Sequence, residues 1–150
     1  LNVYCLSLIE DLFGMPDTYK YYPNKGYNGI DVSGVMMLDY GSFKAISYTA
    51  KDCSGQCQGF IQGTKGFIRI DNMPANVQGM YLKMNGEEEV KIDVLKHDDT
   101  RAYMFTQIAR IVENNDVKKA EAFMNRTLEL MKVMENARKD AGIYFGEGND

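Results

Sequence analysis

The sequence predicts an α+β fold, with a large, mostly antiparallel open β-sheet and helices packed on one of its faces. Apolar residues recur at helical spacing near both ends of the chain, but they alternate with polar residues between Thr18 and Val94. Tight-turn sequences separate the short runs of that middle region, and connections this short join antiparallel neighbours, because a parallel crossover needs a dozen or more residues. The order of helix, many strands, helix and helix is typical of helices layered on one face of an antiparallel sheet.

The composition limits the class of protein. The 150 residues are the length of one domain, and 45% hydrophobic and 25% charged residues are ordinary globular values. The net charge of −4 argues against a nucleic-acid-binding protein, which needs a basic surface. No apolar run approaches the ~20 residues that cross a bilayer, and no signal-peptide pattern is present. We therefore expect a cytoplasmic domain with no nucleic-acid or membrane partner.

The first expected element is a helix that ends at Gly14 and Pro16. Its apolar residues lie at helical spacing, and they are Val3, Leu6, Ile9, Leu12 and Phe13. The apolar helical pattern begins at Leu1 itself, with no capping residue before it in the sequence. We therefore expect the chain to be a piece of a longer protein.

Seven strands are expected next, because short β-rich runs alternate with turn residues. They are Thr18–Tyr22, Asp31–Leu38, Phe43–Ala50, Gln56–Gln62, Phe67–Asp71, Met80–Met84 and Glu89–Val94. The turns have recognisable chemistry: DYGS and DCSG place Asp first and Gly late, GTKG supplies glycine, and NG favours a hairpin.

The faces of this sheet are uneven. Val35 and Met37 point to one side of their strand, and Met36, Leu38 and Tyr40 point to the other, so both sides should be covered. Another mixed face, typical of a protein interface, carries Gln58, Phe60, Gln62, Phe67 and Arg69. A solvated sheet face is the alternative. From the two-sided strand we predict a homodimer formed through the sheet face.

Two helices are expected in the last third of the chain. Asp98 or Asp99 can cap the first of them, and its expected buried stripe is Ala102, Phe105, Ile108, Ala109 and Val112. Asn125 is a plausible cap for the last helix, and Gly142 is expected at its end. The expected apolar face of that helix is Leu128, Met131, Met134 and Ala141.

The residues alone point to little chemistry. The chain has neither a dinucleotide fingerprint nor a P-loop, and CSGQC with a single His in the chain has too few ligands for a metal site. We interpret Cys5, Cys53 and Cys57 as free thiols. The alternative is a Cys53–Cys57 pair, because these two residues flank a turn and could lie close together on neighbouring strands. His97 lies beside a helix start and is most simply interpreted as an ordinary exposed His. The acids from Glu87 to Glu89 are most simply interpreted as a solvated edge of the sheet. We therefore expect neither a metal site nor a cofactor site in this chain.

Three stretches resemble a known family. LNVYCLSLIEDLFGMP resembles the end of a G-G-x-L-x-D-x-G-x-H segment that runs into a helix, FIQGTKGFIRI resembles a strand–GTKG–strand unit, and TLELMKVMENARKDAGIYF resembles a final helix. All three, in this order, are similar to the C-terminal domain of the glucose–fructose oxidoreductase and inositol dehydrogenase family. The resemblance implies that residues 1–150 form one substrate-binding and oligomerisation domain, and that an N-terminal Rossmann domain lies outside this chain.

The resemblance also implies one site residue. Tyr4 falls where the family has an active-site His, and dihydrodiol dehydrogenase-like relatives have Tyr there. Its implied role is that of catalytic acid or base during hydride transfer between NAD or NADP and a sugar, polyol or related hydroxy or carbonyl compound. A phenol with the ordinary pKa of about 10 is a poor base at neutral pH, so the implied mechanism uses a Lys of the Rossmann domain as well. Asn2 departs from the family pattern, which has Gly at that position.

The resemblance implies that the full-length protein uses NAD or NADP, bound mainly by the Rossmann domain. The expected partners of this domain are that Rossmann domain and a small-molecule substrate. We therefore expect the isolated chain to be an inactive fragment of an NAD(P)-dependent oxidoreductase. The alternative is a non-catalytic binding or regulatory module that keeps the same fold.

Overall fold

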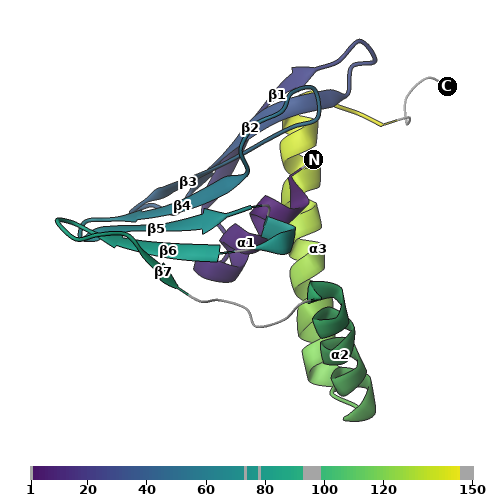
Figure 1. The fold of residues 1–150 in the computed structure, drawn as a ribbon. Helices are drawn as coiled ribbons and strands as arrows, with labels where there is room; N and C mark the ends of the chain where they lie inside the picture. The colour runs from purple at the N-terminus through teal and green to yellow at the C-terminus, as the bar shows by residue number, and fades with distance from the viewer. Residues whose placement is uncertain (1, 73, 78, 93–98, 146–150) are drawn as a thin grey trace. The chain divides into compact units, whose positions relative to one another are not determined.

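The computed structural model describes residues 2–72, 74–77, 79–92 and 99–145. They form two compact units, and each is described by itself: residues 1–54 with 122–150, and residues 55–121. Figure 1 shows the order of the elements along the chain. The α+β prediction is confirmed, with the strands hydrogen bonded in two antiparallel sheets rather than one.

The first unit contains a three-stranded sheet in the order β1-β2-β3. Its strands are β1 (Thr18–Lys25), β2 (Asp31–Asp39) and β3 (Lys44–Ala50), and they agree with the predicted runs to within a few residues. Hairpin turns join them, and Met36 of the central strand lies opposite both Tyr21 and Ser47.

Two helices cover one face of this sheet (Figure 1). They are α1 (Val3–Phe13) and α3 (Val117–Asp140), of which residues 122–140 belong to this unit. The hydrophobic core between the layers consists of Leu6, Tyr21, Met36, Leu38, Leu130, Ala137 and Ile143. The prediction of helices on one face of an antiparallel sheet therefore holds for this unit.

The end of α3 is closed at Gly142, as predicted. Gly142 has a φ of 67°, in the left-handed region that favours glycine. Its N–H donates to the carbonyl of Lys139, and the N–H of Ile143 donates to the carbonyl of Arg138. These two bonds form a Schellman motif, which turns Ile143 back into the core.

A second glycine makes room inside the sheet. A Cβ atom at Gly34 would lie 2.6 Å from the ring and from the hydroxyl of Tyr21. The Tyr21 hydroxyl donates to Asp31 at 2.8 Å, and burial, followed by this carboxylate, raises the pKa of Tyr21. Gly34 therefore leaves room for the Tyr21 ring in the core between the sheet and the helices.

The second unit contains a four-stranded antiparallel sheet in the order β4-β5-β6-β7. The strands are β4 (Gln58–Gly63), β5 (Gly66–Asp71), β6 (Gly79–Met84) and β7 (Val90–Ile92), and a short 3-10 helix spans Pro74–Asn76. The register places the predicted mixed set on one face, because Gln58, Phe60 and Gln62 lie opposite Asp71, Arg69 and Phe67. Arg69 lies 4.0 Å from the centre of the Tyr81 ring and pairs with Asp71 and Glu89.

The helices of the last third differ from the predicted pattern. Asp99 caps α2 (Thr100–Glu113), accepting from the backbone of Arg101 and Ala102, as predicted. The residues of its expected buried stripe are exposed, however.

The last helix begins at Val117 rather than near Asn125, because the carboxylate of Asp116 accepts from the N–H of Lys119. In α3 the buried residues are Leu130, Val133 and Ala137. Of the expected apolar face, Leu128 and Met131 are exposed, but Met134 and Ala141 are partly buried and pack against the core.

Candidate functional site

The predicted site residue, Tyr4, lies in the first turn of α1. The helix begins at Val3 and ends before Gly14, which has a φ of 77°. The Tyr4 side chain is 64% exposed and points away from the core that Leu6 joins. An exposed phenol at a helix start can meet a ligand from outside this unit.

The start of α1 is attached to the sheet by polar groups. The Ser47 hydroxyl donates to Oδ1 of Asn2 at 2.7 Å, and Nδ2 of Asn2 donates to the Ser47 carbonyl oxygen at 3.4 Å. Both residues are buried, with exposed fractions of 5% and 3%. Asn2, where the family pattern has Gly, therefore connects the helix to β3.

The far half of α1 is attached to α3 by Arg126. The Arg126 guanidinium pairs with Asp11, lies 3.3 Å from Glu10 through Nε, and donates to the Ser7 carbonyl oxygen at 2.9 Å. Asp11 is the main reason that the pKa of Arg126 is raised. The Glu10 side chain is only 9% exposed, and its Oε2 has no hydrogen-bond partner among the described residues. Arg126 therefore supplies the counter-charge for a buried carboxylate.

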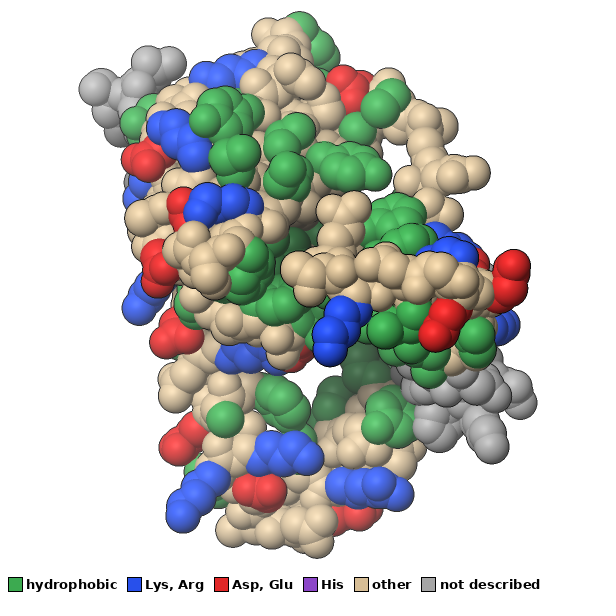
Figure 2. All heavy atoms as spheres, turned by 90° about the vertical axis from the view of Figure 1, so that its left-hand side faces the viewer, with side chains coloured by type: hydrophobic (Ala, Val, Ile, Leu, Met, Phe, Trp, Pro, Cys, Tyr) green, Lys and Arg blue, Asp and Glu red, His purple; other side chains and the backbone are tan. Residues whose placement is uncertain are grey.

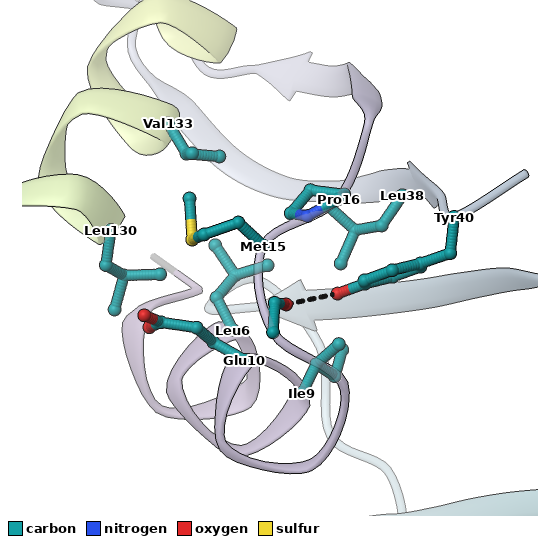
Figure 3. Close-up of a pocket in the computed structure, with 10 residues that line it drawn as sticks. Leu6, Ile9, Glu10, Met15, Pro16, Leu38, Tyr40, Leu130 and Val133 are labelled. Atoms are coloured by element: carbon teal, nitrogen blue, oxygen red, sulfur yellow. Dashed lines mark hydrogen bonds between the residues drawn. The ribbon is translucent and has the colours of Figure 1, made fainter. Parts of the chain in front are cut away.

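A mainly apolar pocket lies beside Glu10, between α1, the end of β2 and α3 (Figure 3). Its apolar walls come from Leu6, Ile9, Met15, Pro16, Leu38, Leu130 and Val133. At one side the Tyr40 hydroxyl donates to the Gly14 carbonyl oxygen at 3.0 Å, and burial, followed by the Glu10 charge, raises the pKa of Tyr40. Tyr4 does not line this pocket, so the structure does not bring the two together.

The remaining candidates form no further site among the described residues. The group around His97 lies outside the described residues. Cys53 and Cys57 are both exposed, and no three potential metal ligands cluster in the part of the chain that the structure describes. Among the described helices none has the length and apolar character to cross a membrane.

Sequence reasoning missed the residues that hold α1 in place. Ser47 and Arg126 are separated from their partners on α1 by 45 residues and by more than 100 residues, respectively. A contact over such a separation leaves no mark on local periodicity or spacing. Only the unusual Asn2, where the family has Gly, offered a sign that the helix start is held differently.

The chain is similar to part of two oxidoreductases. It is 27% identical over 150 residues to the scyllo-inositol 2-dehydrogenase (NADP(+)) IolU of Bacillus subtilis (strain 168), covering 97% of this chain and 44% of the relative. It is 23% identical to the uncharacterized oxidoreductase YgjR of Escherichia coli (strain K12), covering 43% of that protein. The resemblance to the C-terminal domain of the glucose–fructose oxidoreductase and inositol dehydrogenase family is confirmed.

The domain also has the fold of a solved structure. The yvaA protein from Bacillus subtilis matches 93% of this chain with a TM-score of 0.65 at 13% sequence identity, covering 48% of that protein. No protein-family model matches the chain. The chain spans less than half of the length of the curated relatives that it matches.

Proposed function

We propose that this chain is the C-terminal substrate-binding and oligomerisation domain of an NAD(P)-dependent oxidoreductase. The enzyme would transfer hydride between the nicotinamide and a sugar, polyol or related hydroxy or carbonyl compound, in the cytoplasm. The observation that carries the proposal is the match of 97% of the chain to 44% of a scyllo-inositol 2-dehydrogenase (NADP(+)). The cofactor would be bound mainly by a Rossmann domain elsewhere in the full-length protein.

Tyr4 is the proposed catalytic acid or base. Its exposed position in α1 supports this role, because the phenol is accessible to a substrate held between this domain and a Rossmann domain. Closure of two domains around a substrate excludes water from the reacting groups. In the direction of oxidation, the Tyr4 phenolate, stabilised by a cationic Lys of the other domain, would accept the one proton of the substrate hydroxyl while the hydride leaves the substrate carbon for the nicotinamide.

The proposal is tested by assaying the full-length protein and this chain side by side. The full-length protein should reduce NAD⁺ or NADP⁺ with at least one member of a panel of inositols, sugars and diols, followed by the absorbance of the reduced nicotinamide. The isolated chain should show no turnover, and calorimetric titration should give a Kd for NAD(P)H weaker than about 1 mM, a binding free energy smaller in magnitude than about 4 kcal/mol. Micromolar binding to the isolated chain would contradict the division of roles, and inactivity of the full-length protein across the panel would favour a non-catalytic module.

We also propose a homodimer through the open face of β1–β3, which turns away from α1 and α3. Alternation along the strands leaves five large apolar residues exposed there, and they are Tyr22, Val35, Met37, Ile46 and Tyr48. Exposed hydrophobic side chains among charged ones are visible on the molecular surface in Figure 2. Contiguous apolar patches of this kind mark interaction sites in proteins.

Light scattering should therefore give twice the monomer mass at micromolar concentration, and Ile46→Lys should shift the protein toward monomer. Ile46 is 60% exposed, so the substitution adds a charge to the patch without entering the core. Val112→Lys, at an exposed apolar position of α2, is the matched control and should leave the mass unchanged. A monomer over the whole concentration range, or equal effects of both variants, would contradict a dimer through this face.

A further inference from the structure

The Asn2–Ser47 pair occupies an unusual place in the fold. Asn2 is the N-cap residue of α1, and its carbonyl accepts the first helical bond from the N–H of Leu6 at 3.0 Å. Its side chain, however, makes no capping bond to the helix. The amide group is instead hydrogen bonded through both of its polar atoms to Ser47 of β3. The side chain that would ordinarily cap the helix is therefore used to attach the helix to the sheet.

This arrangement matters for the first turn of α1. A side-chain cap contributes about 1 kcal/mol to the stability of a helix start, and α1 has no such cap and no acidic residue in its first turn. The first turn is held from one side by the Asn2–Ser47 pair and from the other by Leu6, which is 3% exposed in the core. The only residues between these two attachments are Val3, Tyr4 and Cys5.

Helix geometry then determines where Tyr4 points. At 3.6 residues per turn, Asn2 and Leu6 lie on the same side of the helix, and Tyr4 is turned by about 200° from each of them. With the two flanking residues attached to the sheet and core, the Tyr4 side chain is directed away from this unit, in agreement with its exposure. Rotation of the first turn would therefore change the direction in which the Tyr4 side chain points.

We propose that Asn2 and Ser47 are positioning residues for Tyr4, and this inference rests on the catalytic role proposed for Tyr4. The pair sets the direction and distance at which the phenol meets a substrate, although neither residue touches the substrate. Catalytic groups must be held closely, since a misplacement of 1 Å can lower a rate by about 100-fold. A Gly at position 2 would leave the backbone free there. The Asn2–Ser47 pair instead gives this position a fixed connection to β3.

The first test is made on the isolated chain and needs no activity. In Asn2→Ala and Ser47→Ala, the amide of Leu6, which donates to the Asn2 carbonyl, should exchange with solvent at least about 5-fold faster, because about 1 kcal/mol of local stabilisation is lost. Amides of the β1–β2 ladder should be unaffected. Tyr21→Phe is the matched control, because it removes a hydroxyl of the same unit that bonds to Asp31 rather than to the start of α1. Unchanged exchange at Leu6, or an equal change in Tyr21→Phe, would overturn the inference.

The second test uses the full-length protein. Asn2→Ala and Ser47→Ala should each lower kcat at least 10-fold while the KM for the cofactor stays within 2-fold, and the double variant should lose little more than either single variant, because the two residues act as a unit. Tyr21→Phe should keep kcat within 2-fold. If Tyr4→Phe lowers kcat but the Asn2 and Ser47 variants behave like Tyr21→Phe, the positioning role is overturned and the function proposed for Tyr4 stands. If Tyr4→Phe itself has no effect, the proposed function fails, and the positioning role fails with it whatever the exchange experiment shows.

Discussion

Tyr4→Phe in the full-length protein is expected to lower kcat by at least about 100-fold, because positioned acids and bases contribute roughly 100- to 10,000-fold to a rate. The substitution removes only the phenolic hydroxyl and leaves the ring. The Tyr4 side chain is exposed and on the outer side of α1, so the fold should keep its stability to within about 0.5 kcal/mol. Steady-state kinetics with saturating cofactor gives the expected loss, and the KM for the cofactor should not change.

Tyr27→Phe is the control for this experiment. Tyr27 is fully exposed in the turn between β1 and β2 and takes no part in the proposed site. The same chemical change there should leave kcat within 2-fold of the unmodified protein. A Tyr4→Phe variant with equally undiminished kcat would remove Tyr4 from the mechanism, whatever other residues of the first turn do.

Arg126→Met is expected to lower the free energy of unfolding of the chain by about 2 kcal/mol. This is less than the roughly 3–5 kcal/mol lost when one partner of a fully buried ion pair is removed, because the Arg126 side chain is 32% exposed. The methionine keeps much of the apolar stem but removes the charge that faces Glu10 and Asp11 and the bond to the Ser7 carbonyl. Glu10 would then be a buried carboxylate without a cation beside it. Urea denaturation followed by circular dichroism measures the change.

Lys139→Met is the matched control, because Lys139 pairs with Glu135 one turn away on α3 with both side chains half exposed. Such surface pairs contribute less than about 0.5 kcal/mol. Glu10→Gln added to Arg126→Met should restore part of the lost stability, because a neutral amide needs no counter-charge. An Arg126→Met variant no less stable than Lys139→Met would show that the cluster does not hold α1 against α3.

The strands could be predicted well because their signals are local. Each of the seven runs is bounded by turn residues, and the alternation of Val35 and Met37 with Met36 and Leu38 already separated the two faces of β2. In the structure one of these faces lies under α1 and α3 and the other is open. Successive side chains of a strand point to opposite faces, so the alternation assigned each of these residues to one face.

The helix faces could not be predicted in the same way. In α3, Leu128 and Met131 make as good an apolar pattern as Leu130 and Val133, and only packing against the sheet decides which pair is buried. The start of α3 was missed because Asp116 and Asn125 are both acceptable caps by residue type. For the candidate site, family resemblance pointed to Tyr4, but the residues that hold its helix are distant in sequence and could be found only in the structure.

Gly34 and Tyr21 lie so close on neighbouring strands that side chains at these two positions compete for the same space. A side chain at position 34 would occupy the space now filled by the phenol ring, because its first carbon would already lie within 3 Å of three ring and hydroxyl atoms. The strand pair can therefore carry bulk at position 21 or at position 34, but not at both. A residue larger than glycine at position 34 would therefore require the Tyr21 ring to move, or a shorter side chain at position 21.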